Sequence, residues 1–241
     1  MTDELSSGEE LKRRAAVAAA AWVEEGMVLG LGTGTTVRFL LEEIARRRAA
    51  GQLRDIRCVP TSLHTAERAG ILGIPLTNLS ETPRVDLTID GADEVDPELN
   101  LVKGLGGALL REKIVAAASA AMIVIVDESK LVPRLGTRSP LPVEVDPFGA
   151  VIQPAFLRGL GAEPELRMAH GVPLATDGGN HIFDCRFPGG IEDAAALESA
   201  LNNRPGVVEN GLFIGMAGRV VVAGEGGVRV LSRDPREAAA V

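Results

Sequence analysis

Short apolar segments alternate with amphipathic segments from the N-terminus to Lys130, and this alternation restricts the possible folds more than any other feature. Segment 9–25 carries apolar side chains at helical spacing, and the apolar segment 27–31 follows it directly. Strands that alternate with helices favour a parallel, doubly wound sheet with right-handed crossovers. We therefore predict an α/β fold with a Rossmann-like parallel sheet. Its further strands are expected at 56–60, 74–76, 85–89 and 121–126.

A second pattern begins after Leu135, where glycine and proline residues mark a linker. The segments that follow read β-α-β-β-α-β, the order of a ferredoxin-like α+β domain. The strands of this pattern are expected at 141–145, 165–168, 181–186 and 207–213, and the helices at 150–160 and 191–202. Because the strand-like segment 219–223 is assigned to the first sheet, the second domain is an insertion. We predict a Rossmann-like catalytic domain of residues 1–136 plus 214–241 and a ferredoxin-like domain of residues 137–213.

Composition excludes several classes of protein. The chain has 241 residues and is 46% hydrophobic, which is enough for a substantial core. A net charge of -8 argues against nucleic-acid or anionic-membrane binding, since both depend on basic surface. The apolar runs are far shorter than the roughly 20 residues of a membrane span, and segment 1–10 is acidic rather than a basic leader. We expect a soluble cytoplasmic protein.

The metal-ligating residue types show no metal-site spacing. Cys58 and Cys185 lie in apolar, strand-like segments without a Cys-x-x-Cys pattern, which favours buried reduced thiols over a disulfide or zinc site. The three histidines, His64, His170 and His181, are scattered over a predicted helix, loop and strand. We predict no metal and no cofactor.

A glycine-rich loop joins the strand at 27–31 to a helix predicted over 37–48. Its sequence is Gly32-Thr33-Gly34-Thr35-Thr36. Backbone N–H groups and hydroxyls at a helix N-terminus suit a phosphate. A dinucleotide-binding fingerprint that starts at Gly30 would need glycine at position 35, and the Gly-Lys-Ser/Thr ending of a P-loop is absent. An ordinary tight βα turn is the structural alternative.

Two acidic residues follow the strand predicted at 85–89. Asp90 and Asp93 come at its carboxyl end, and Lys130 follows the strand predicted at 121–126. Open α/β sheets bind ligands at the carboxyl ends of their strands. We expect these side chains to line one edge of the sheet, together with Thr33 and Lys103.

A second glycine turn precedes a helix predicted to begin near Ala108. Lys103 stands ahead of this turn and Glu112 about one helical turn inside the helix. If the ligand is a small phosphorylated sugar, Glu112 can remove a proton next to a carbonyl and return it to the neighbouring carbon, while Lys103 stabilises the enediolate. Asp90 and Asp93 would accept hydrogen bonds from hydroxyls, and one could assist ring opening. Alternatively, Glu112 is a solvated helix charge and the two aspartates cap a turn.

Several motifs together resemble the ribose-5-phosphate isomerase type A family. They are Gly-Leu-Gly-Thr-Gly-Thr-Thr (30–36), Asp-Gly-Ala-Asp-Glu (90–94), Lys-Gly-x-Gly-Gly-Ala-Leu-Leu-Arg-Glu-Lys-Ile (103–114) and Ser-Lys (129–130). The similarity continues through Leu-Pro-Val-Glu-Val (141–145) and Pro-Gly-Val-Val (205–208) to Gly-Leu-Phe (211–213), so it covers nearly the whole chain.

The resemblance implies metal-free interconversion of ribose 5-phosphate and ribulose 5-phosphate through a cis-enediolate, in a homodimer or homotetramer. It implies that Glu112 is the proton acceptor, with Asp90, Asp93 and Lys103 as further catalytic residues. The implied substrate-binding residues are Thr33, Gly34, Thr35, Thr36, Asp90, Gly91, Ala92, Asp93, Lys103, Gly104, Leu105, Gly106 and Lys130, with Lys12 from the less distinctive N-terminal helix. Leu105 and Thr35 depart from the residues that the family often has, glycine and serine.

Three other functions share parts of this pattern. A related sugar-phosphate isomerase or deaminase would differ in its substrate. A sugar-phosphate sensor would have no need of a proton-shuttling base and would require a DNA-binding module, for which the sequence before the first helix leaves no room. A CoA transferase would need a catalytic glutamate in another loop and a CoA site, and neither is evident.

Overall fold

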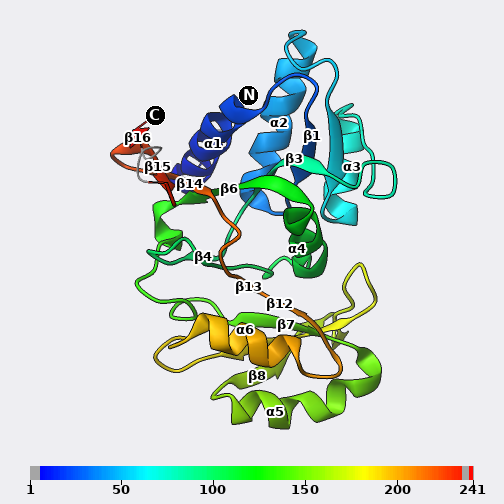
Figure 1. The fold of residues 1–241 in the computed structure, drawn as a ribbon, viewed down its shortest axis with the longest axis vertical. Coiled ribbons are helices and arrows are strands. Elements are labelled where there is room, and N and C mark those ends of the chain that lie inside the picture. Colours follow the sequence, from blue (N-terminus) through cyan, green and yellow to red (C-terminus); the bar gives the residue numbers. More distant parts are fainter. Residues whose placement is uncertain (1–5, 235–238, 241) are drawn as a thin grey trace. The chain divides into compact units, whose positions relative to one another are not determined.

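The computed structural model describes residues 6–234 and 239–240, and the chain forms two compact units (Figure 1). The first unit comprises Met1–Gly91, Ile114–Lys130 and Met216–Val241, and the second comprises Ala92–Lys113 and Leu131–Gly215. The domain limits predicted from the sequence place residues 92–113, and also 131–136 and 214–215, in the first domain, whereas these segments belong to the second unit. Segment 92–113 joins the second unit because its two short strands pair with a strand at 212–213.

The first unit is built on a seven-stranded sheet of order β16-β15-β14-β6-β3-β1-β2. Its five strands from β14 to β2 are parallel, and β15 and β16 add an antiparallel edge. This arrangement confirms the Rossmann-like sheet. The strands are β1 (Val28–Leu31), β2 (Arg57–Pro60), β3 (Val85–Asp90), β6 (Ser119–Asp127), β14 (Arg219–Gly224), β15 (Gly227–Ser232) and β16 (Ala239–Ala240).

Helices cover both faces of this sheet. Successive side chains of a strand point to opposite faces, so apolar residues of one strand can pack against helices on either side. Leu29 and Leu31 belong to the core that the sheet shares with three helices, α1 (Ser7–Ala19), α2 (Thr35–Ala49) and α3 (Leu63–Ile71). Val28 packs on the other face with Val115 from α4 (Leu109–Ala117). Two short 3₁₀ helices, η1 (Ala20–Trp22) and η2 (Glu128–Lys130), follow α1 and β6.

The second unit contains a four-stranded antiparallel sheet of order β12-β7-β11-β8. The chain order β-α-β-β-α-β of its elements and this strand order confirm the ferredoxin-like arrangement. The elements are β7 (Leu141–Val145), η3 (Pro147–Ile152), α5 (Gln153–Gly159), β8 (Glu163–Leu166), β11 (His181–Arg186), α6 (Ala194–Asn202) and β12 (Val207–Asn210). A hairpin of β9 (Met168–Ala169) and β10 (Val172–Pro173) lies between β8 and β11 in the chain.

A three-stranded sheet completes the second unit, and its strands come from distant parts of the sequence. It consists of β4 (Glu94–Val95), β5 (Leu101–Val102) and β13 (Leu212–Phe213) in the order β13-β5-β4. The single strand predicted at 207–213 is therefore wrong. At Gly211 the chain passes from β12 in one sheet to β13 in another. The strand predicted at 74–76 is also wrong, since Leu76 makes only an isolated bridge to Cys58.

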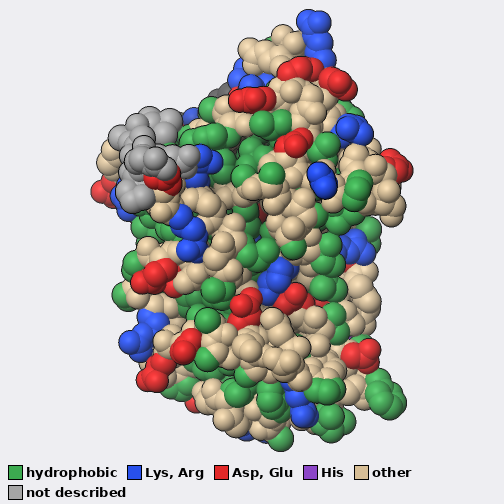
Figure 2. Space-filling view, viewed as in Figure 1, with side chains coloured by type: hydrophobic (Ala, Val, Ile, Leu, Met, Phe, Trp, Pro, Cys, Tyr) green, Lys and Arg blue, Asp and Glu red, His purple; other side chains and the backbone are tan. Residues whose placement is uncertain are grey.

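On the face shown in Figure 2, acidic and basic side chains are interspersed among the residues that the structure describes. None of the helices in the described part of the chain combines the length and the apolar composition that crossing a bilayer requires.

Both cysteines are free and buried, as predicted. Burial raises the pKa of the Cys58 thiol and of the Cys185 thiol to about 12.

Because the thiolate is the reactive form, we predict that DTNB near pH 8 labels neither cysteine in the folded protein and both after unfolding. The exposed Ser80 provides a control, since a Ser80→Cys variant should react at once. Rapid labelling of the unmodified folded chain would contradict the burial of these thiols.

Candidate active site

The predicted site residues fall into two groups, one in each compact unit. Loop 32–36, Asp90, Gly91, Lys12 and Lys130 belong to the first unit. The second unit contains the remaining group, which consists of Ala92, Asp93, Lys103, Gly104, Leu105, Gly106 and Glu112. We describe each group within its own unit.

Loop 32–36 follows β1 and leads into the N-terminus of α2. Gly34 is the N-cap of α2, and its φ of +124° is in the region that favours glycine. The N–H groups of a first helical turn have no partner within the helix and carry the positive end of its dipole. The loop therefore has the local structure of an anion site, as the sequence predicts.

Asp90 holds this loop against the end of β3. Its carboxylate is buried, and Oδ1 accepts hydrogen bonds from the N–H of Thr33 at 3.0 Å and of Gly91 at 2.7 Å. Gly32 is required here, since a Cβ at this position would lie 2.0 Å from Asp90 Oδ1. The aspartate thus orients the loop, and the small residue lets the carboxylate approach the backbone closely.

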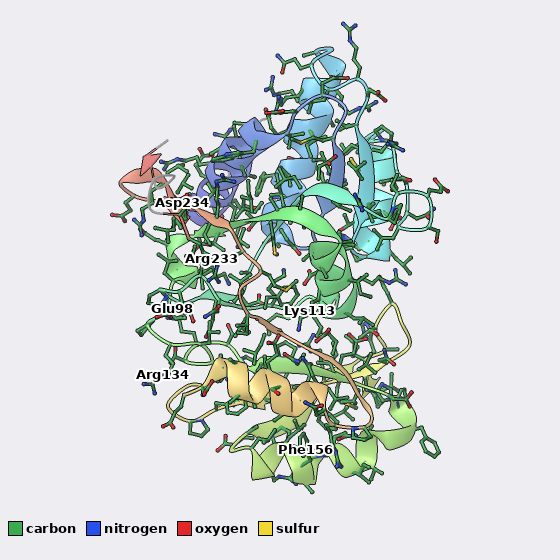
Figure 3. All side chains as sticks on the ribbon, in the orientation of Figure 1. Glu98, Lys113, Arg134, Phe156, Arg233 and Asp234 are labelled. Carbon is green, nitrogen blue, oxygen red and sulfur yellow. The ribbon has the colours of Figure 1, made fainter. Side chains whose placement is uncertain are left out.

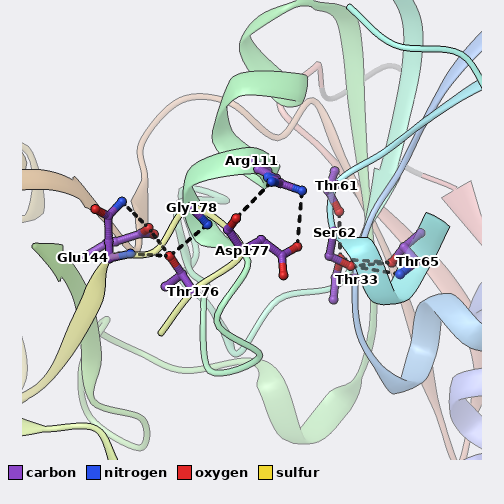
Figure 4. A network of polar contacts seen from close by, with 10 residues as sticks. Thr33, Thr61, Ser62, Thr65, Arg111, Glu144, Thr176, Asp177 and Gly178 are labelled. Carbon is purple, nitrogen blue, oxygen red and sulfur yellow. Dashed lines mark hydrogen bonds and ion pairs between the residues drawn. The ribbon is translucent and has the colours of Figure 1, made fainter. Parts of the chain in front are cut away.

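The hydroxyl of Thr33 belongs to a cluster of hydroxyl groups (Figure 4). Its Oγ1 lies 2.8 Å from Thr61 Oγ1, 2.8 Å from Ser62 Oγ and 3.1 Å from Thr65 Oγ1. Thr65 Oγ1 also donates to the carbonyl of Gly32 at 2.9 Å. These contacts tie the loop to the first turn of α3, whose N-cap is Ser62, as predicted. Sequence reasoning assigned Thr33 to the ligand and missed the roles of Thr61 and Thr65, because no local pattern marks this contact.

Both predicted cations of the first unit are half-buried. Lys12, on α1, donates from Nζ to Thr35 Oγ1 at 3.0 Å, so the N-terminal helix brings an ammonium group to the loop. Lys130 ends η2, directly after β6. β6 is parallel to β3, and Val124 is the register partner of Asp90. The carboxyl ends of these neighbouring strands therefore carry Asp90 and Lys130 at the same edge of the sheet.

Lys103 and Glu112 form a buried ion pair in the second unit. Lys103 Nζ lies 3.1 Å from Glu112 Oε2, and the side chains are only 3% and 5% exposed. This burial rules out the alternative that Glu112 is a solvated helix charge. Lys103 follows β5 of the three-stranded sheet rather than a strand of the parallel sheet. A carboxylate beside an ammonium group in such a dry setting can accept a proton and stabilise an anion formed nearby.

The glycine turn between these two residues is held by several backbone contacts. Asp93 Oδ2 accepts from the Leu105 N–H at 3.0 Å, and the Gly104 carbonyl accepts from the Gly107 N–H at 3.0 Å. Gly104 and Gly107 have φ values of +106° and +80°, which a residue with a side chain rarely adopts. The Leu105 side chain is exposed, so position 105 contributes to the turn through its backbone.

A second lysine, whose side chain is only 12% exposed, lies on α4 one residue after Glu112. Lys113, labelled in Figure 3, donates from Nζ to Glu209 Oε1 and to the Asn210 carbonyl, each at 2.7 Å. Burial lowers the pKa of the Lys113 ammonium group, against the opposite effect of Glu209. Lys113 Nζ is 4.9 Å from the centre of the buried Phe213 ring, and Lys103 Nζ is 5.4 Å from it. This aromatic ring therefore supports both lysines, a contact that the sequence does not reveal.

Glu94, the last residue of the Asp-Gly-Ala-Asp-Glu motif, has a structural role. It is fully buried and accepts hydrogen bonds from the backbone N–H groups of Gly136, Arg138 and Ser139. Among the residues that the structure describes, no group of three or more His, Cys, Asp or Glu side chains is placed to hold a metal ion.

Comparisons with known proteins identify the family. The family model described as ribose 5-phosphate isomerase A (phosphoriboisomerase A) matches residues 57–227. A protein named ribose-5-phosphate isomerase A from Gloeobacter violaceus is 56% identical over 223 residues, which are 92% of this chain and 96% of that protein.

Two solved structures share the fold over nearly their whole length. One, a D-ribose-5-phosphate isomerase in complex with phospho-erythronic acid, has a TM-score of 0.92 and 41% identity, over 95% of this chain and 100% of that one. The other, ribose 5-phosphate isomerase from Plasmodium falciparum, has a TM-score of 0.91 and 38% identity, over 94% of this chain and 99% of that one. The chain therefore belongs to the ribose 5-phosphate isomerase A family.

Proposed function

We propose that this protein interconverts D-ribose 5-phosphate and D-ribulose 5-phosphate, an aldose-ketose isomerisation of the non-oxidative pentose phosphate pathway. The observation that carries the proposal is the buried Lys103–Glu112 ion pair on either side of a glycine turn. Family membership supports the same reaction, since related proteins of similar length are named for it.

The substrate phosphate is assigned to loop 32–36. The N-terminal turn of α2 offers backbone N–H groups, and Lys12 Nζ lies 3.0 Å from the hydroxyl of Thr35 within the same loop. Because the Thr33 hydroxyl is occupied by other hydroxyls, Thr35 and Thr36 are the side chains available to the phosphate. Lys130 is the second proposed cation of this group.

Glu112 is the proposed base. In the open-chain aldose it removes the proton from C2, and the electrons of that C–H bond form the C1–C2 double bond while the C1 carbonyl oxygen becomes anionic. Lys103 stabilises this enediolate through its ammonium group. Glu112 then returns the proton to C1, and the O2 proton passes to O1 to leave the C2 carbonyl of the ketose. Asp90 and Asp93 are proposed to accept hydrogen bonds from substrate hydroxyls, and one of them to assist ring opening.

We also propose a cytoplasmic homodimer or homotetramer that acts without a cofactor. The free, buried thiols suit a reducing compartment. The oligomeric state rests on the family resemblance.

Glu112→Gln should abolish turnover and preserve substrate binding, because the amide keeps the shape of the side chain but cannot accept the proton. The measurement is ribulose 5-phosphate formation from ribose 5-phosphate in excess EDTA, with substrate binding determined in parallel. Glu163→Gln, an exposed change on β8, is the control and should match the unmodified protein. Activity in every variant would remove Glu112 from its role, and activity in none would indicate another sugar phosphate or a sensor.

Lys103→Ala should lower kcat by about a hundredfold, as expected for the loss of one group that stabilises an oxyanion. The change also leaves Glu112 buried without its lysine partner, so folding must be checked by circular dichroism before rates are compared. A folded variant with less than about a twofold change in kcat would make Lys103 a structural residue.

A further inference from the structure

Arg167 connects the ferredoxin-like sheet to the glycine turn after Lys103. This residue lies between β8 and β9, and its Nη1 donates to the carbonyl oxygens of Gly104 at 3.0 Å and Leu105 at 3.1 Å. Arg167 is 62 or 63 positions away from these residues in the sequence, and no motif marks it. The contact therefore depends on the fold of the second unit.

The guanidinium group is held rigidly on its other side. Nε donates to Asp184 Oδ2 at 2.8 Å, Nη2 pairs with Asp184 Oδ1, and the arginine side chain is only 12% exposed. The backbone is fixed as well, since the Arg167 N–H donates to Ile182 O at 2.8 Å and its carbonyl accepts from Leu174 N–H at 2.9 Å. The bidentate pair with Asp184, together with the fixed backbone, sets the direction of the remaining N–H groups of the Arg167 guanidinium.

The turn needs an external support of this kind. Three of the four residues at 104–107 are glycines, which restrict the backbone least. Besides Arg167, Asp93 holds the turn at the Leu105 N–H, and the Gly107 N–H bonds to the Gly104 carbonyl. The peptide group between Gly104 and Leu105 would keep its bonds to Gly107 and Asp93 without Arg167. Removing Arg167 would therefore release mainly the Leu105 carbonyl and leave the peptide plane between Leu105 and Gly106 free to rotate.

The orientation of these carbonyls also determines where a backbone donor points. In a trans peptide the N–H and the C=O point in opposite directions. The Leu105 carbonyl faces Arg167, so the N–H of Gly106 in the same peptide group faces away from Arg167. Within the described part of the chain this N–H has no hydrogen-bond partner.

We propose that Arg167, held by Asp184, is a positioning residue that keeps the Gly106 N–H directed at the reacting oxygens of the substrate, an inference that rests on the isomerase function proposed above. A donor fixed in advance stabilises developing charge without reorganisation during the reaction. Lysine cannot replace the arginine, because one ammonium group cannot bind a carboxylate in bidentate fashion and two carbonyls together.

The test compares Arg167→Gln and Arg167→Lys with a matched control, Arg204→Gln. Arg204 belongs to the same unit, bonds to Gln153 through Nε and stacks over Phe156, so its loss removes an arginine without touching the turn. Each variant is assayed with ribose 5-phosphate. Inhibition is measured with phospho-erythronic acid, whose carboxylate presents two anionic oxygens beside a phosphorylated chain, and with inorganic phosphate.

Both Arg167 variants should lower kcat by about tenfold to a hundredfold and change KM by less than about threefold, the pattern of a misplaced group that acts in the transition state. The inhibition constant of phospho-erythronic acid should rise in proportion to the loss of kcat/KM, and that of inorganic phosphate should stay constant. Asp184→Asn should show the same pattern more weakly and add little to Arg167→Gln, because the two residues act as one unit.

Two results would overturn the proposal. One is an Arg167→Gln enzyme with the kcat of the Arg204→Gln control. The other is a loss of activity matched by an equal loss of folded protein, with the inhibition constants of phospho-erythronic acid and of inorganic phosphate both unchanged, which would make Arg167 a purely stabilising residue. An unmodified protein without isomerase activity would refute the proposed function, and this inference with it, so the two failures are distinguishable.

Discussion

The buried ion pair of Lys103 and Glu112 is the constraint on which the second unit depends. Two charges withdrawn from water are stable only when each finds a close partner, and here Nζ and Oε2 are 3.1 Å apart with both side chains almost fully buried. The chain must leave β5 and turn sharply to enter α4 with Glu112 on the side of Lys103. This requirement explains the glycines of the turn, and the nearby Phe213 ring supplies an aromatic contact for the lysine.

In both units a glycine allows the backbone to approach a proposed site residue closely. A Cβ at Gly32 would lie 2.0 Å from Asp90 Oδ1, and a Cβ at Gly211 would lie 2.2 Å from the carbonyl oxygen of Lys103. In each unit a glycine thus makes room for a residue assigned to the chemistry. A binding residue is positioned accurately when the backbone next to it can come close enough to hold it. Glycine at positions 32 and 211 therefore serves close packing rather than flexibility.

The ferredoxin-like sheet also has a part in the proposed site. Arg167 and Asp184 extend its hydrogen bonding to the turn at 104–107, and Lys113 ties α4 to β12 through Glu209. A turn rich in glycine is held in one conformation by side chains on a sheet whose own core is well packed. The second unit therefore supplies rigidity for the proposed chemistry as well as the proposed base Glu112 and its partner Lys103.

The sequence by itself determined the features that depend on local pattern. Strands β7 and β11 begin and end where alternation predicts, Ser62 caps α3 as its residue type predicts, and the motifs from Gly30 to Lys130 identify the family. Only the tertiary structure decided that Thr33 bonds to Thr61 and Thr65, that 92–113 joins the second unit, that 207–213 divides between two sheets, and that Arg167 reaches the glycine turn. The physical reason is that periodicity and capping act over a few neighbouring residues, whereas these contacts join residues far apart in the chain and exist only once the core has brought them together.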